Sequence, residues 1–271
     1  MNFKLKALAA ALAVIAAAPA GAAFLVDGQS GNGSLFLSAW DSNAQTSYTR
    51  NLQVGGTNLL MNGFTGTSNL SFASDANMAT FLSMVTPANV VWNVVALDTL
   101  GTDYVAGALN YFTTFAGTPT SDQLPVNQKL ANGSENAYIG AANGLHVNED
   151  PSQPNLLTIG NSLVRVSHGP TDYAYAGSGA GSNTFGGQFP SGFSNVGTLD
   201  QSLDFYKFSS TKGNHYTKAT VTPFTGGTWT LSSSGALNYS VAAVPLPAAA
   251  WLFVSGLLGL VGVSRRKSTI A

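Results

Sequence analysis

The stretch Val90–Leu97, with the sequence VVWNVVAL, decides the fold that this sequence predicts. Only Asn93 interrupts its apolar residues, and four of the eight positions are valine. A short apolar stretch rich in β-branched residues is typical of a strand that is buried on both faces. We therefore predict a central strand here, within a larger sheet.

A helix is expected immediately before this strand, over Ser74–Val85. Ser74 can cap it, Asp75 suits the positive end of the helix dipole, and Pro87 prevents continuation. The apolar residues that recur at helical spacing are Met78, Phe81, Leu82 and Val85. This is the one amphipathic helix that the middle of the chain predicts.

Short strands are expected through the rest of the middle. Ser34–Trp40 and Tyr48–Val54 flank a polar turn and predict a hairpin. The other predicted strands are Thr158–Ser167, Leu203–Ser209, Lys218–Val221, Thr228–Leu231 and Ala236–Ala243. Four Asn-Gly turn signals begin at Asn32, Asn62, Asn132 and Asn143. This pattern favours a mainly β fold, an antiparallel β-sandwich of jelly-roll type with the helix across an edge or end.

The N-terminus has the three parts of a secretory signal peptide. Lys4 and Lys6 precede the uncharged stretch Ala7–Ala18, and Pro19 is followed by small residues. We predict a signal helix within residues 1–23, with cleavage after Ala22 or Ala23.

The C-terminus predicts a membrane-spanning helix. Val244–Val263 is a stretch of 20 residues without charge. A helix over Ala248–Val263 would cover about 24 Å, a short but sufficient span of the hydrocarbon layer. The cations that follow, Arg265, Arg266 and Lys267, resist translocation and predict a cytoplasmic C-terminus.

These C-terminal features together resemble a known sorting signal. Val244, Pro245, Leu246, Pro247 and Ala248, then an apolar helix and a basic tail, are similar to the VPLPA-CTERM variant of the PEP-CTERM proteins. The resemblance covers residues 244–271 only. It implies recognition and cleavage by an exosortase, after removal of the signal peptide by signal peptidase. It also implies a precursor in the inner membrane and a mature form at the cell surface or in an extracellular polysaccharide matrix.

Between the two signals lies one expected domain, residues 24–243. It contains 6 basic and 12 acidic residues, a net charge of −6. Nucleic-acid binding needs clustered Lys and Arg, so this charge argues against such a partner. The chain has no cysteine, which excludes disulfides and thiolate chemistry.

Four residues of the middle are the best candidates for ligand binding. Asp98 and Asp103 lie just after the central strand, where a carboxylate can bind a ligand or simply cap a turn. Tyr173 and Tyr175 alternate beside a glycine-rich loop, and we expect them to be exposed and able to stack on sugar rings.

We prefer to explain the other clusters of polar and aromatic residues without a functional role. His146, Glu149 and Asp150 match no metal-ligand spacing, so we expect neither a metal nor a cofactor. Asp200 and Asp204 would share a face if their segment were a strand, as a glycosidase pair would require. The tryptophans Trp40, Trp92 and Trp229 could stack on sugars but are more often core residues.

The sequence contains no established catalytic motif, so no catalytic residue is assigned. Two functions fit it. The first is a non-enzymatic structural or adhesive protein of an exopolysaccharide matrix or biofilm. The second is a carbohydrate-binding module or glycoside-active enzyme of the same matrix.

Overall fold

The computed structural model describes residues 33–54, 57–58, 64, 66–98, 101–102, 104–130, 162–167, 172, 175–177 and 195–241. All of them belong to the first of the two units into which the chain divides, Met1–Val241 and Ala242–Ala271. The expected signal helix, the sorting motif and the expected transmembrane helix lie outside the described residues. Of the helices that are described, none has the length and apolar character needed to cross a membrane.

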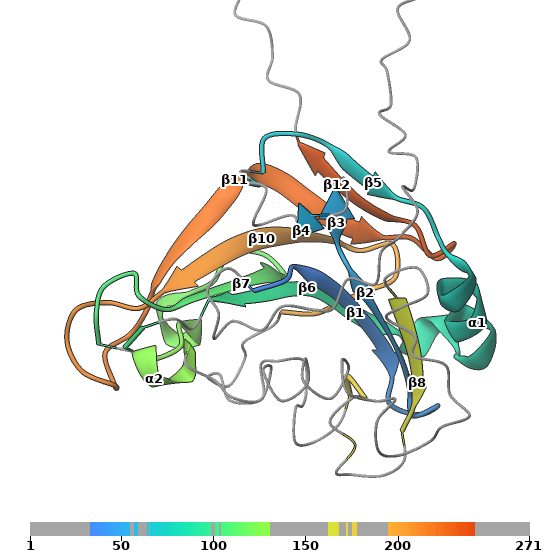
Figure 1. The fold of residues 1–271 in the computed structure, drawn as a ribbon, viewed down its shortest axis with the longest axis horizontal. Coiled ribbons are helices and arrows are strands. Elements are labelled where there is room, and N and C mark those ends of the chain that lie inside the picture. Colours follow the sequence, from blue (N-terminus) through green and yellow to red (C-terminus); the bar gives the residue numbers. More distant parts are fainter. Residues whose placement is uncertain are drawn as a thin grey trace, which may run out of the picture. The chain divides into compact units, whose positions relative to one another are not determined.

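The described residues form a mainly β structure with short helices (Figure 1). The strands are β1 (Phe36–Asp41), β2 (Thr46–Asn51), β3 (Gln53–Val54), β4 (Thr57–Asn58), β5 (Leu70–Phe72), β6 (Val91–Asp98), β7 (Asn110–Phe115), β8 (Ser162–Val166), β9 (Gly197–Thr198), β10 (Ser202–Ser209), β11 (Thr220–Leu231) and β12 (Leu237–Val241). The α-helices are α1 (Ala76–Met84) and α2 (Asn127–Leu130), and the 3-10 helices are Pro87–Asn89 and Ser121–Gln123.

Ten of these strands form a single antiparallel sheet. Its order is β5-β12-β11-β10-β7-β6-β1-β2-β8, and β9 pairs with β6. The strands β3 and β4 pair separately. The sheet curls, so that β12 and β5 arch over β10 and β7 (Figure 1). Two facing sheets of jelly-roll type are therefore not confirmed, because β6, β7 and β10 hydrogen-bond the two halves into one sheet.

The predicted centre of the sheet is confirmed. All of VVWNVVAL except Val90 lies in β6, which pairs with β1 on one side and with β7 on the other. Trp92, Val94, Val95 and Ala96 are buried, as a strand covered on both faces requires. The predicted hairpin is also present, because β1 pairs with β2 around a turn at residues 42–45.

Four details of the predicted elements are wrong. The body was expected to hold one helix, but a second short helix, α2, is present, and its four residues are too few to give a clear helical periodicity. The segments 218–221 and 228–231, expected as two strands, belong largely to the single strand β11, which absorbs Pro223 and Gly227 by a shift of register against β10. The strand β7 was not predicted, although its aromatic and threonine residues favour a strand. The cap of α1 is Asp75 rather than Ser74, because the Asp75 side chain accepts from the amide of Met78.

Both faces of the sheet are buried. One core contains Trp92, Phe205, Trp229 and Tyr239, and α1 adds Met78 and Phe81 to it. The other core contains Phe36, Tyr111, Phe115 and Phe208, and is covered in part by Leu130 of α2 and by Tyr175 and Ala176. Burial on both faces explains why so many large aromatic side chains lie in the interior of a mainly β domain.

Candidate functional site

Tyr175 was expected to be exposed and able to stack on sugar rings, and this prediction is wrong. Its side chain is 2% exposed and packs in the core with Trp40. Its hydroxyl donates to the carbonyl of Asp41 at 3.2 Å, and burial raises the pKa of this phenol. The apolar body of the ring is used for packing, and its hydroxyl satisfies the β1 backbone. Tyr173 lies outside the described residues.

The tryptophans Trp40, Trp92 and Trp229 also serve the core. Their exposed fractions are 2%, 0% and 0%. Trp92 donates its indole N–H to the carbonyl of Thr198 at 2.8 Å, which ties β6 to β9. Their predicted core role is confirmed, and none of the three can stack on a sugar from outside.

Asp98 is the second predicted ligand-binding residue that the structure describes. It ends β6, and its carboxylate accepts from the Asn110 amide at 3.2 Å. The oxygen of the same Asn110 amide accepts from the Ser209 hydroxyl at 2.7 Å. Asp98 therefore belongs to a polar cluster that crosses β6, β7 and β10 at one end of the sheet. Asp103, its predicted partner, lies outside the described residues.

Asp200 and Asp204 do not share a strand face. Asp200 lies in the turn before β10 with a positive φ of 63°, and its carboxylate accepts from the amide of Ser233 at 2.9 Å. Asp204 is within β10. The paired arrangement that a glycosidase needs is therefore not made by these two residues.

Among the described residues, no group of three or more His, Asp or Glu side chains is placed to hold a metal ion. The cluster at His146, Glu149 and Asp150 lies outside them. So do the sorting motif Val244–Ala248 and the basic tail.

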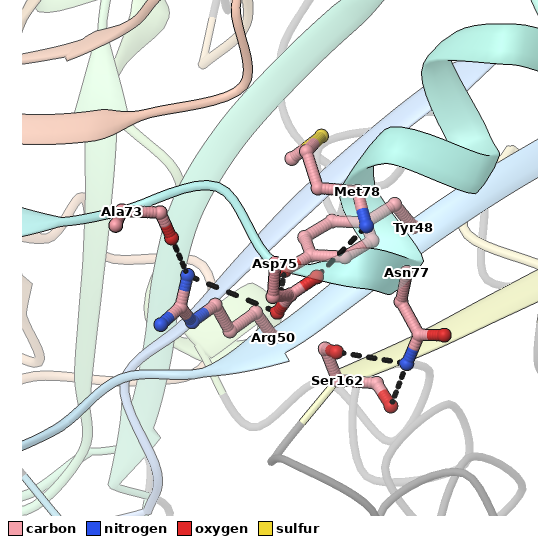
Figure 2. A network of polar contacts seen from close by, with 7 residues as sticks. All are labelled: Tyr48, Arg50, Ala73, Asp75, Asn77, Met78 and Ser162. Atoms are coloured by element: carbon pink, nitrogen blue, oxygen red, sulfur yellow. Dashed lines mark hydrogen bonds and ion pairs between the residues drawn. The ribbon is translucent and has the colours of Figure 1, made fainter. Parts of the chain in front are cut away.

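A polar network surrounds the start of α1 (Figure 2). Asp75 accepts from the Met78 amide at 2.8 Å and from the Tyr48 hydroxyl at 2.9 Å. Arg50 lies 3.8 Å from the same carboxylate and donates to the carbonyl of Ala73 at 2.6 Å. Burial raises the pKa of the Tyr48 phenol, and the Asp75 carboxylate contributes in the same direction. This network attaches α1 to β2, so its role is structural.

Exposed aromatic side chains gather elsewhere, on two loops near Asp98. Within the described part of the chain, Tyr104 is 47% exposed, Val105 49% and Tyr216 76%. The first two lie on the loop between β6 and β7, and Tyr216 lies on the loop between β10 and β11. The ring of His215 meets that of Tyr104 edge-on, with 5.6 Å between the ring centroids. We call Tyr104, Val105, His215 and Tyr216 the aromatic loop surface.

The two loops are tied to each other. The amide of Gly107 donates to the carbonyl of Ser210 at 2.7 Å. The Ser210 hydroxyl donates to the carbonyl of Val105 at 2.6 Å and accepts from the amide of Leu109 at 3.0 Å. The loops therefore form one surface rather than two independent segments.

Helix α2 lies beside the second loop and fixes it (Figure 1). The buried Asn127 side chain donates to the carbonyls of Thr211 and Asn214 at 2.8 and 3.1 Å and accepts from the Thr211 amide at 2.9 Å. The amide of Gln128 donates to the carbonyl of His215 at 3.0 Å. These bonds hold Tyr216 in place while leaving its ring in solvent.

Neither His215 nor the two tyrosines Tyr104 and Tyr216 were singled out from the sequence. A signal for Tyr216 was present, since it follows Gly213 and Asn214 in a polar turn between two strands, where an aromatic side chain has no core to enter. No local signal could place Tyr104 beside His215, because more than 100 residues separate them.

Comparison of the chain with protein-family models, with curated proteins and with solved structures finds no match.

Proposed function

We propose that this chain is an exported protein with a non-enzymatic structural or adhesive role at the cell surface or in an extracellular matrix. Its precursor would be held in the inner membrane and sorted through the C-terminal signal at Val244–Ala248. The observation that carries the proposal is the order of features at this end. Strand β12 ends at Val241, and the motif begins three residues later.

The end of β12 is firmly held. It pairs with β11 on one side and with β5 on the other, and the amide of Val241 donates to the side chain of Asn69 at 2.7 Å. Three extended residues reach at most about 10 Å. A sorting protease that cleaves near the motif would therefore act beside a folded domain.

The described carboxylates with assigned partners support a structural role for the body. Asp41 accepts from the amides of Asn43 and Ala44 at 2.8 and 3.1 Å, and from that of Thr86 at 3.1 Å. Asp172 pairs with Arg165 at 2.8 Å in the interior. These groups organise turns and fasten loops to the sheet, which is what a stable, cysteine-free exported domain needs.

The proposal is tested by fractionating cells that carry an exosortase and produce the full chain. We expect the wild-type body, detected with an antibody against it, in the matrix or medium and shorter than the precursor. Replacing Pro245 and Pro247 by alanine should leave the full-length chain in the membrane. Neutralising Arg265, Arg266 and Lys267 to alanine should weaken its retention during sorting.

A matched control is Pro119→Ala, which changes a proline in a loop far from the motif in the sequence and should leave sorting unchanged. Equal release of the wild-type chain and the double proline variant would refute the role of the motif. Reproducible hydrolysis of matrix sugars by the purified chain would refute the non-enzymatic role.

Carbohydrate binding is the second candidate function. The observation in its favour is the aromatic loop surface, where two tyrosine rings are held in solvent on a rigid support.

A further inference from the structure

The aromatic loop surface stands out among the exposed apolar groups of the described residues. Five large apolar side chains of the described residues are substantially exposed. Three of them, Tyr104, Val105 and Tyr216, belong to this surface. The other two are Met84 and Val166, on α1 and β8. An exposed cluster of this kind on fixed loops indicates an interaction site rather than scattered surface residues.

The rings are presented at little conformational cost. Tyr216 is 76% exposed, yet hydrogen bonds to Asn127 and Gln128 hold the backbone on either side of it. Tyr104 is held against His215. A ligand that binds rings already in place loses less affinity to ordering than one that binds mobile rings.

Lysines are concentrated at this end of the domain, although Asp98 ends β6 there and Asp122 lies 3.9 Å from Lys218. The loop from Thr211 to Lys218 carries Lys212 and Lys218 and no acidic residue, and α2 beside it carries Lys129. Half of the 6 basic residues in 24–243 therefore lie at this end of a domain with a net charge of −6. Lys212 is exposed, whereas Lys218 also donates to the carbonyl of Ser121 at 2.6 Å.

Aromatic faces beside an ammonium group match the chemistry of an acidic sugar. The C–H face of a pyranose ring is apolar and packs on an aromatic ring, while a uronic-acid carboxylate pairs with lysine. Nucleic acid carries one charge per ~1.7 Å of duplex and needs a larger cluster of Lys and Arg than the lysines at this end supply. A protein partner would more often require a larger apolar area around the anchoring aromatic residues.

We propose that the aromatic loop surface binds an anionic polysaccharide, with Tyr104 and Tyr216 stacking on pyranose rings and Lys212 pairing with a uronic-acid carboxylate. This inference rests on the proposed function, because it supplies the ligand of an exported matrix protein. It names a contact surface that differs from the predicted pair Tyr173 and Tyr175.

The test uses the full chain, purified in mild detergent, and isothermal titration calorimetry. The probes are an oligogalacturonate and its fully methyl-esterified form, which has the same backbone without the charge, both with EDTA present. We expect the wild-type chain to bind the acid form, more weakly as salt is raised, and to bind the ester at least about fivefold more weakly. Tyr216→Ala should weaken binding about five- to tenfold, and Tyr216→Phe less than about twofold.

Lys212→Ala should weaken binding of the acid form and leave binding of the ester unchanged. Met84→Ala is the matched control, because it removes a 44% exposed apolar side chain from α1 and should not alter binding. Unfolding curves check that the variants fold, which the exposure of Tyr216 and Lys212 leads us to expect.

Three results would overturn the proposal: no binding of either probe, equal binding of acid and ester, or equal loss in Met84→Ala and Tyr216→Ala. These results are independent of sorting, since the purified chain is titrated whether or not it is cleaved in cells. Normal sorting of a chain that binds neither probe would therefore overturn this inference and leave the proposed function standing.

Discussion

At the residue scale, Asp75 joins α1 to β2. Its carboxylate caps α1, accepts from the Tyr48 hydroxyl and faces Arg50 (Figure 2). Asp75→Ala should lower the free energy of unfolding by about 1–3 kcal/mol, because it removes a cap and leaves a buried phenol without its acceptor. Asp75→Asn should cost less, since asparagine also caps helices. Urea unfolding measures both.

Asp122→Ala provides the comparison for this prediction. The Asp122 side chain is 96% exposed and lies 3.9 Å from Lys218, and an exposed pair of this kind contributes little to stability. If Asp122→Ala were as destabilising as Asp75→Ala, the capping network would not have the role assigned to it.

Buried tyrosines predict how stability depends on pH. Burial raises the pKa of Tyr48, Tyr175 and Tyr239 above the value in the unfolded chain, which is about 10. Above that pH the unfolded chain loses these protons while the folded chain retains them, so the free energy of unfolding falls as pH rises. Denaturant unfolding between pH 8 and 11 should show this decline.

Tyr48→Phe separates this effect from general alkaline damage. Phenylalanine cannot ionise, so the decline in this variant should be shallower than in the wild-type chain, whatever its stability at pH 8. Parallel curves for the two proteins would show that Tyr48 does not contribute to the pH dependence.

At the scale of elements, α2 has its main effect on the loop between β10 and β11. Asn127 is fully buried, and both polar atoms of its amide bond to the backbone of this loop. Asn127→Ala should lower the free energy of unfolding by about 1–3 kcal/mol, because it removes three partly buried hydrogen bonds to the backbone of the loop. Hydrogen exchange should report faster exchange over residues 211–217.

Gln128→Ala changes the next residue of α2, which is exposed and contacts the loop through its backbone. It should leave both stability and exchange near wild type. Protection of residues 211–217 that persists in Asn127→Ala would show that the loop is held by other contacts.

The strands illustrate which elements a local pattern can predict. VVWNVVAL was identified as central because apolar residues on both faces have few alternatives. The sequence predicted two strands in place of β11, because Pro223 and the glycines are typical of a break between strands. Only the pairing with β10 shows that a single strand continues through them. Strand β7 was missed although its composition suits a strand, since its burial depends on neighbours distant in sequence.

At the scale of the whole molecule, strand β12 should set the limit to which the chain can be shortened from its C-terminus. Strand β12 lies between β11 and β5 and buries Leu237 and Tyr239. Removing residues 236–271 would expose both positions in the core, a loss of about 3–6 kcal/mol against a total stability of about 5–15 kcal/mol. Removing only residues 242–271 leaves the strand in place.

Circular dichroism of the two secreted products, beginning at Phe24, checks this prediction. The chain that ends at Val241 should unfold in one cooperative thermal transition, whereas the chain that ends at Gly235 should show no such transition. Cooperative unfolding of the shorter product would show that β12 is dispensable.

The sequence by itself determined the mainly β class, the central strand, the first hairpin, α1 and the core position of Trp92. Each depends on local periodicity or on the burial of apolar side chains, which neighbouring residues largely dictate. The same local reading predicts the two terminal signals and the sorting motif, which stay predictions.

Only the tertiary structure decided that the strands join in one curled sheet and that Tyr175 is buried. It also brought Tyr104 beside His215 and set the β10–β11 loop on Asn127. These features depend on strand pairing and on contacts between residues far apart in the chain. Many registers satisfy the same alternation of side chains, and packing of the complete sheet selects among them.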